Sequence, residues 1–193
     1  MMGPLIIVSG PSGSGKSTVI ARLLETSPRP LHRSVSATTR APRPGEEDGV
    51  HYHFWTPEHF EAEVKAGAFL EWARVHGNCY GTLRREVEEP RARGEGVILV
   101  IDVQGAKQIR GLYPVAVAVF LRTSNPETYE QRLRERGTEN EAAFQRRLKA
   151  AADELARAAD YDHQVINDDL DSAVTRLRAI VQQQFDKGDG NAG

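Results

Sequence analysis

A glycine-rich segment near the start of the chain carries residue types suited to binding phosphate. It reads Gly10-Pro11-Ser12-Gly13-Ser14-Gly15-Lys16-Ser17-Thr18 and fits G-x-x-x-x-G-K-[ST], the phosphate-binding loop. Its glycines let backbone N–H groups turn toward a phosphate, and a helix beginning near the lysine adds the positive end of its dipole. Lys16 would reach the β- and γ-phosphates of a nucleotide, with the Ser17 hydroxyl on Mg²⁺. The alternative is a flexible turn with a surface lysine, which the flanking pattern disfavours.

The pattern on both sides of this loop predicts the elements that would hold it. Residues 5–8 form a short apolar run typical of a buried strand, and residues 17–24 place their apolar side chains on one helical face. Residues 97–102 and 115–121 are continuous apolar runs, typical of central parallel strands covered on both faces. We therefore predict an α/β fold with a phosphate-loop NTPase-type parallel sheet flanked by helices.

Two segments interrupt this alternation. Residues 34–82 contain short pieces of mixed polarity around a proline- and glycine-rich stretch, which predicts an inserted, mixed α/β lobe that is partly antiparallel. Within it, Thr56 can cap a helix that begins at Pro57. Residues 126–159 contain a helix start at Pro126 and a capping-box spacing at 138–141, ahead of a helix to about Ala159. The second segment is thus expected to form a helical lid.

The whole chain is expected to form a single domain. Its core would comprise residues 1–33, 83–125 and 160–187, the last piece containing a short strand in "QVIND" and a terminal helix over 170–185. The lobe would span about 34–82 and the lid about 126–159. Residues 188–193 are polar and glycine-rich, so we expect a disordered tail.

Composition bounds the partners and the compartment. A chain of 193 residues with 39% hydrophobic content can bury one substantial core. Its formal net charge of -2 gives no bulk attraction for nucleic acid or for an anionic membrane. The single cysteine, Cys79, cannot form an intramolecular disulfide, and no signal peptide or membrane-spanning run is evident. We expect a cytoplasmic protein, with the choice between monomer and homo-oligomer left open.

Several ordered blocks carry a resemblance to a known family. They are "SVSATTRAPRPGEEDGVHYHF", "FLEWARVHGNCYG", "IDVQG", "RGTENE" and "VINDDLD". In that order and spacing, together with the phosphate loop, they resemble the guanylate kinase family from Leu5 to about Phe185. The resemblance implies an enzyme that converts ATP and GMP to ADP and GDP, a step that supplies guanine nucleotides. It leaves the use of dGMP open.

The resemblance assigns a binding site for the GMP phosphate. In the family, the S-x-T-T-R segment and the charged residues after it contact the nucleoside monophosphate, and the matching residues here are Ser36, Arg40, Arg43, Glu46, Tyr52 and Tyr80. Arg40 and Arg43 resemble the phosphate clamp, assisted by the two tyrosine hydroxyls. Guanidinium groups match phosphate oxygens bidentately, and phenols add neutral donors. Taken alone, two arginines in such a loop would be read as solvated charge.

The same resemblance points to residues that would read the guanine base. A carboxylate at Glu71 could accept hydrogen bonds from guanine N1–H and the 2-amino group together, whereas adenine lacks that arrangement of donors. Ser36 and Thr82 would lie near the base. Asp102, at the end of the run 97–102, is placed between the donor phosphates and GMP; ligands of open α/β sheets bind at strand ends. The alternative for Glu71 is an edge-strand carboxylate facing water.

Arginines of the lid complete the implied site. Arg136 and Arg147 would touch the transferring phosphates, with Arg132 nearby, and Asn167 would lie near the adenine of ATP. Arg134 and Arg146 are better interpreted as parts of a solvated face.

Two features fall outside this assignment. The chain departs from the family at Val100, where an acidic residue often stands, so any role of that acid is absent or moved. His51 and His53 could suggest a metal site, but no third ligand is obvious. Cys79 is interpreted as a packing residue.

Two rival functions follow from the same resemblance. Guanylate-kinase-like domains of scaffold proteins use this lobe to bind phosphorylated peptides, but typically have a degraded phosphate loop. A kinase of the same architecture could instead act on a ribose bisphosphate, which the set Ser36, Glu71 and Tyr80 disfavours.

Overall fold

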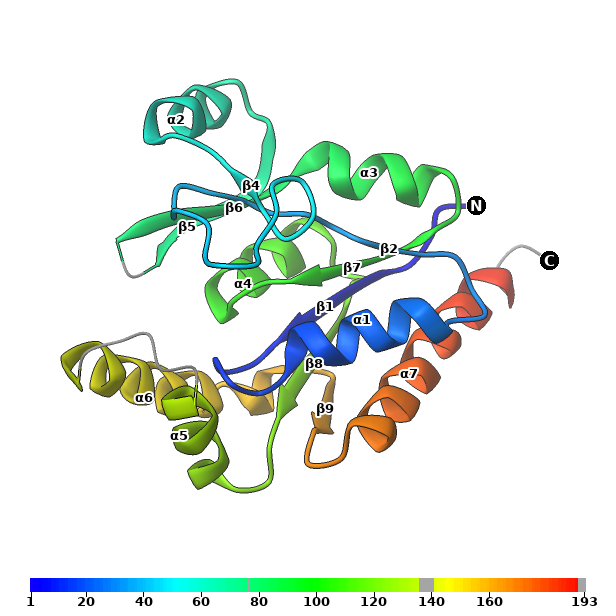
Figure 1. Cartoon of the computed structure of the whole chain (residues 1–193). Helices are drawn as coiled ribbons and strands as arrows, with labels where there is room; N and C mark the ends of the chain where they lie inside the picture. The colour runs from blue at the N-terminus through cyan, green and yellow to red at the C-terminus, as the bar shows by residue number, and fades with distance from the viewer. Residues whose placement is uncertain (76, 136–140, 191–193) are drawn as a thin grey trace.

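The computed structural model describes residues 1–75, 77–135 and 141–190, with backbone only for residues 126, 132, 133, 135, 141–143, 146 and 147. Helices and strands alternate along most of this length (Figure 1). In chain order they are β1 (Leu5–Ser9), α1 (Lys16–Thr26), β2 (Leu31–Arg33), β3 (Ala37–Thr38), β4 (His53–Phe54), α2 (Pro57–Lys65), β5 (Phe69–Val75), β6 (Asn78–Leu83), α3 (Arg84–Ala92), β7 (Gly96–Val100), α4 (Val103–Leu112), β8 (Val117–Arg122), α5 (Pro126–Glu135), α6 (Glu141–Leu155), a 3₁₀ turn (Ala158–Asp160), β9 (His163–Ile166) and α7 (Leu170–Gly190).

The core sheet has the order β2-β7-β1-β8-β9 within the described residues, and all its neighbouring strands run parallel. Alternate residues of β1 face opposite sides, so Ile6 and Val8 pack against α1 and α7, whereas Leu5 and Ile7 pack against α3 and α4. Parallel strands buried on both faces require this covering by helices. The predicted parallel sheet flanked by helices is confirmed.

The lobe contains its own small sheet, of order β4-β3-β6-β5 in the described part of the chain. β6 pairs antiparallel with β3 and β5, and β3 pairs parallel with β4. Its helix α2 begins as expected, because Pro57 occupies the first turn and the Thr56 hydroxyl accepts from the His59 N–H. Cys79 packs against the cluster around Phe60 and Phe69, as a small apolar side chain does.

The lobe and the α5–α6 pair lie toward one end of the core strands, at the left of the view, and the chain termini lie toward the other end (Figure 1). Helix α6 ends at Leu155, before the expected Ala159, and a 3₁₀ turn follows. The capping box at 138–141 falls largely on residues outside those described. None of the described helices is long and apolar enough to cross a membrane.

Helix α7 differs from expectation at its end. It continues to Gly190, three residues into the segment 188–193 that was expected to be a disordered tail. Arg29 forms ion pairs with Asp186 and Asp189, and its guanidinium lies 4.8 Å from the centroid of the Phe185 ring. These contacts come from a segment far away in sequence, so the local composition of the tail did not reveal them.

Candidate active site

The glycine-rich segment forms a tight loop between β1 and α1. A Cβ atom at Gly10 would lie 2.0 Å from the Leu121 carbonyl oxygen of β8, so only glycine fits there. Gly15 caps the N-terminus of α1 with a φ of 86°, in the left-handed region that favours glycine. The first turn of α1 therefore follows the loop directly, and the N-terminal end of a helix, with its positive dipole, is suited to an anion site.

Two side chains hold this loop in place. The Lys16 ammonium donates to the carbonyl oxygens of Gly10 (2.5 Å) and Pro11 (3.0 Å), so it folds back over its own loop. Asn167, which follows β9 and is buried, donates from its amide to the Ser14 carbonyl at 2.7 Å. Asn167 thus joins the loop to the far edge of the sheet, while its contact with adenine stays a prediction.

Asp102 lies beside the loop because β7 pairs with β1 up to Val8 and Val100. Its carboxylate accepts from the N–H groups of Gln104 (2.7 Å) and Gly105 (3.0 Å) and so caps α4. A negative charge at a helix N-terminus is favourable. The position at the carboxyl end of the central strands agrees with the expected one, although the strand itself ends at Val100.

The sequence interpretation missed Glu154, near the end of α6. Burial raises the pKa of the Glu154 carboxyl to about 7, while the Lys16 charge lowers it and Asp102 raises it. The lid helix therefore brings a carboxyl group into the electrostatic environment of the phosphate loop. The sequence spacing could have indicated that Glu154 faces the protein. Glu154 lies three residues after Ala151 and four before Ala158, which are both buried, and residues three or four apart share a helical face.

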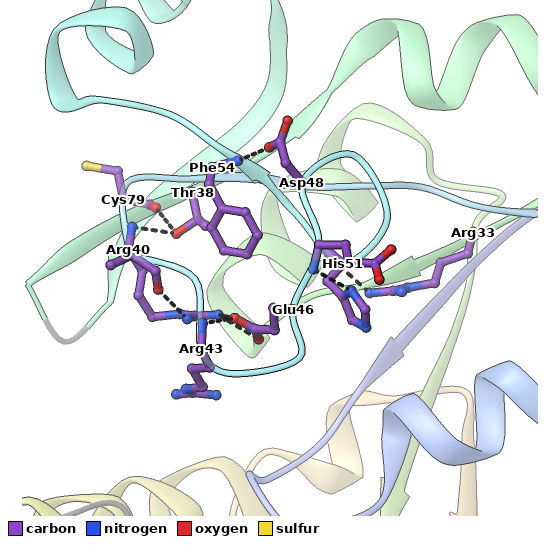
Figure 2. Close-up of polar contacts among 11 residues, drawn as sticks. Arg33, Thr38, Arg40, Arg43, Glu46, Asp48, His51, Phe54 and Cys79 are labelled. Carbon is purple, nitrogen blue, oxygen red and sulfur yellow. Dashed lines mark hydrogen bonds and ion pairs between the residues drawn. The ribbon is translucent and has the colours of Figure 1, made fainter.

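Arg40 and its neighbours form a compact cluster on the lobe (Figure 2). The Arg40 guanidinium lies 2.9 Å from the Glu46 carboxylate and 5.5 Å from the centroid of the Tyr52 ring. The Tyr52 and Tyr80 rings meet edge to face at 6.0 Å between centroids. The structure thus brings together four of the six residues assigned to the phosphate site.

Arg43 and Ser36 take different positions. The Glu46 carboxylate accepts from the Arg43 backbone N–H at 2.8 Å, but the exposed Arg43 guanidinium points away from the Arg40–Glu46 pair (Figure 2). Ser36 is half-buried, and its carbonyl accepts from the His53 N–H at 2.9 Å. The alignment of Arg43 with a bound phosphate remains a prediction.

Glu71 lies on β5, the edge strand of the lobe sheet, but only 6% of its surface is exposed, so its carboxylate does not face water. The Thr82 hydroxyl on the paired strand donates to its Oε1 at 2.6 Å. Burial is the main cause that raises the pKa of Glu71 to about 7; the bond from Thr82 lowers it and Asp102 raises it further. A Cβ at Gly105 of α4 would lie 2.8 Å from Glu71 Oε2, so the glycine makes room for the carboxylate.

The remaining assigned residues lie on the loop and the lid. Ser17 is exposed in the first turn of α1, where an oxygen ligand suits Mg²⁺, a hard cation that keeps several waters and phosphate oxygens. Arg132 and Arg147 belong to α5 and α6, but their side chains lie outside the described set, and Arg136 falls entirely outside it. Among the described residues, no group of three or more His, Cys, Asp or Glu side chains could hold a metal ion.

The raised pKa of Glu71 leads to a prediction about pH. Guanine N1–H and N2–H need an ionised acceptor, so the KM for GMP should rise as the pH falls below about 7, by up to about tenfold per unit. Steady-state kinetics from pH 6 to 8.5, on the wild type and on Glu71→Gln, would measure this. The GMP phosphate also titrates near pH 6, but it does so equally with both proteins. Identical pH slopes for the two would contradict the role of Glu71.

The fold and this arrangement define a phosphate-loop kinase of the nucleoside monophosphate class. A phosphate loop stands beside a lobe that carries an arginine–tyrosine cluster and a buried carboxylate. A family model described as guanylate kinase matches residues 2–184. The chain therefore belongs to the guanylate kinase family, whose members are ATP-dependent.

Individual relatives agree with this assignment. A guanylate kinase of Synechococcus sp. (strain CC9311) is 49% identical over 171 residues, which cover 89% of this chain and 90% of that protein. A guanylate kinase of Fusobacterium nucleatum subsp. nucleatum is 47% identical over 181 residues, with coverages of 94% and 97%. The crystal structure of guanylate kinase from Anaplasma phagocytophilum superposes with a TM-score of 0.79 at 32% identity, covering 95% of this chain and 86% of that one.

Proposed function

We propose that this protein transfers the γ-phosphoryl group of ATP to GMP, giving ADP and GDP. The observation that carries the proposal is the buried Glu71 carboxylate, which lies beside the first turn of α4. Asp102 caps that turn and follows β7, next to the strand that leads into the phosphate loop. A guanine base bound to Glu71 would therefore lie at the same edge of the core sheet as the phosphates of ATP.

Each substrate has its own set of residues in this proposal. The loop 10–18, with Lys16, holds the ATP phosphates, and Asn167 supports the loop. Arg40, Arg43, Tyr52 and Tyr80 bind the GMP phosphate, with Glu46 orienting Arg40. Glu71, Thr82 and Ser36 read guanine. Arg132, Arg136 and Arg147 of the lid stabilise the transferring phosphoryl group.

For this phosphoryl transfer, the protein has to position the two substrates and stabilise negative charge. The phosphate oxygen of GMP that attacks is already anionic, so no general base is needed. Mg²⁺, held with the ATP phosphates and the Ser17 hydroxyl, would neutralise charge on the β- and γ-oxygens. Arginine side chains stabilise a loose transition state, and closure of the lobe and the lid excludes the water that would otherwise hydrolyse ATP.

A coupled assay of ADP release tests the proposal. With Mg-ATP and each of GMP, dGMP, AMP, CMP and UMP, we expect rapid turnover confined to guanine nucleotides. Turnover with a different acceptor would assign another substrate. Absence of turnover with every nucleotide, together with tight binding of a phosphopeptide, would support the scaffold function instead.

A further inference from the structure

Glu86 lies where the two connections between the core and the lobe run close together. One connection is the segment 34–36, between β2 of the core sheet and β3 of the lobe sheet. The other is the junction at Leu83 and Arg84, where β6 of the lobe leads directly into α3. Glu86 is in the first turn of α3, where the helix dipole favours a negative charge.

Three nitrogen donors from three parts of the chain surround the Glu86 carboxylate. His32 Nε2, on β2 of the core, lies 3.3 Å from Oε2. The Val35 N–H, in the connecting segment, donates to the same oxygen at 3.3 Å. His53 Nε2, on β4 of the lobe, lies 3.5 Å from Oε1. One carboxylate thus joins the core, the connection and the lobe.

The contact with His53 is shielded from water. The His53 Nε2 atom is buried and forms no hydrogen bond within the described part of the chain; its ion-pair partner is Glu86 Oε1 at 3.5 Å. The Glu86 side chain is 18% exposed and that of His53 is 19% exposed. A buried ring nitrogen without a partner is costly, so an Nε2–H directed at Glu86 is the favoured arrangement.

His53 is in turn bonded to the residues assigned to GMP. Its backbone N–H donates to the Ser36 carbonyl at 2.9 Å, and β4 pairs with β3 through His53 and Ala37. Tyr52, the preceding residue, meets Tyr80 and lies under Arg40. A shift of β4 relative to the core would therefore displace both the base-reading serine and the phosphate cluster.

We propose that Glu86 is a positioning residue that sets the GMP-binding lobe against the core through His32, Val35 and His53. It contacts neither substrate in this proposal. Its loss should weaken GMP binding while leaving the ATP site, which is built on β1, α1 and β9, almost unchanged. This inference rests on the proposed function of the lobe.

The test is Glu86→Gln, compared with Glu88→Gln on the same helix. Glu88 contacts Arg84 and Tyr113, which belong to α3 and the core. With both substrates varied, we expect Glu86→Gln to raise the KM for GMP about fivefold or more, through weakened charge-assisted bonds. The KM for ATP and the kcat should change less than about twofold, and Glu88→Gln should leave all three near wild type. An equal rise in both KM values, or an unchanged KM for GMP, would overturn the proposal.

A second variant covers the case in which Glu86→Gln folds poorly. His53→Gln keeps the carboxylate and should also raise the KM for GMP selectively. An unchanged KM for GMP in His53→Gln would overturn the proposal. Where Glu86→Gln folds, the double variant should be less than additive, because both substitutions remove the same contact, and full additivity would overturn the proposal as well. Wild-type protein that fails to phosphorylate GMP in the same assay would refute the proposed function itself, which separates the two failures.

Discussion

Replacing Lys16 with Met is expected to reduce kcat by at least about 10²–10³-fold, the loss typical of removing one aligned donor from a transition state. Met is one atom shorter than Lys and has no charge, while the loop is still held by Gly10, by Gly15 and by the bond from Asn167 to Ser14. In the free protein, the Lys16 ammonium donates to the Gly10 and Pro11 carbonyls. Substrate phosphates would compete for the same ammonium, which therefore has to exchange its partners when ATP binds.

The loss should be catalytic rather than structural. Two hydrogen bonds disappear in the variant, so we expect the free energy of unfolding to fall by about 1–3 kcal/mol with the fold retained. Lys107→Met, on the exposed side of α4, is the matched control and should keep wild-type activity. The coupled assay of ADP release and thermal melts on the same samples would distinguish a loss of catalysis from a loss of stability. Near-normal turnover of Lys16→Met would refute the chemistry proposed for the loop.

The sequence predicted those parts of the structure that depend on local rules. The apolar runs became β1, β7 and β8 of a parallel sheet, with boundaries one or two residues away from those expected. The cap at Thr56 and Pro57 was found because its residues are neighbours in sequence. The spacing of the phosphate loop also placed it correctly between a strand and a helix. In each case the signal lies within one turn or one strand.

The rest depends on contacts between segments that are distant in sequence. The burial of Glu71 against Gly105 requires α4 to pack on β5. The residues next to Glu71 or Gly105 in sequence do not predict this packing. The extended end of α7 forms an ion pair with Arg29, which lies far away in sequence. The direction of Arg43 depends on a loop whose conformation is fixed by Glu46. Glu154 was missed for the same reason, because its neighbour Lys16 lies at the other end of the chain.

Replacing Glu71 with Gln is expected to remove the preference for guanine. Gln offers one accepting oxygen and one donating amide, so the amide would face a donor of the base instead of accepting from it. Hydrogen bonds to charged groups contribute about 1.5–3 kcal/mol each, which predicts a fall of about 10²-fold or more in kcat/KM for GMP. The relative rate with AMP should rise. The nucleotide panel measures both, and Glu61→Gln, exposed on α2 of the same lobe, is the matched control.

The same substitution should stabilise the free protein at alkaline pH. The pKa of Glu71 is about 7 in the folded chain and about 4.3 in an unfolded one. Between these values the folded state binds more protons, so the stability contributed by Glu71 falls as the pH rises through this window and stays low above pH 7. The cost is on the order of 3 kcal/mol, and a neutral Gln, which can still accept from Thr82, does not incur it.

Opposite changes in activity and stability would therefore identify Glu71 as a residue kept for binding. At pH 8 the Gln variant should melt at a higher temperature than the wild type while it phosphorylates GMP poorly. The difference in melting temperature should close as the pH falls toward 4.5, because both proteins are then neutral at this position. Added GMP should raise the melting temperature of the wild type more than that of the variant, since bound guanine compensates the buried charge. If the variant lost activity and stability together at pH 8, Glu71 would be a structural residue, and the discrimination of guanine would have to arise elsewhere in the lobe.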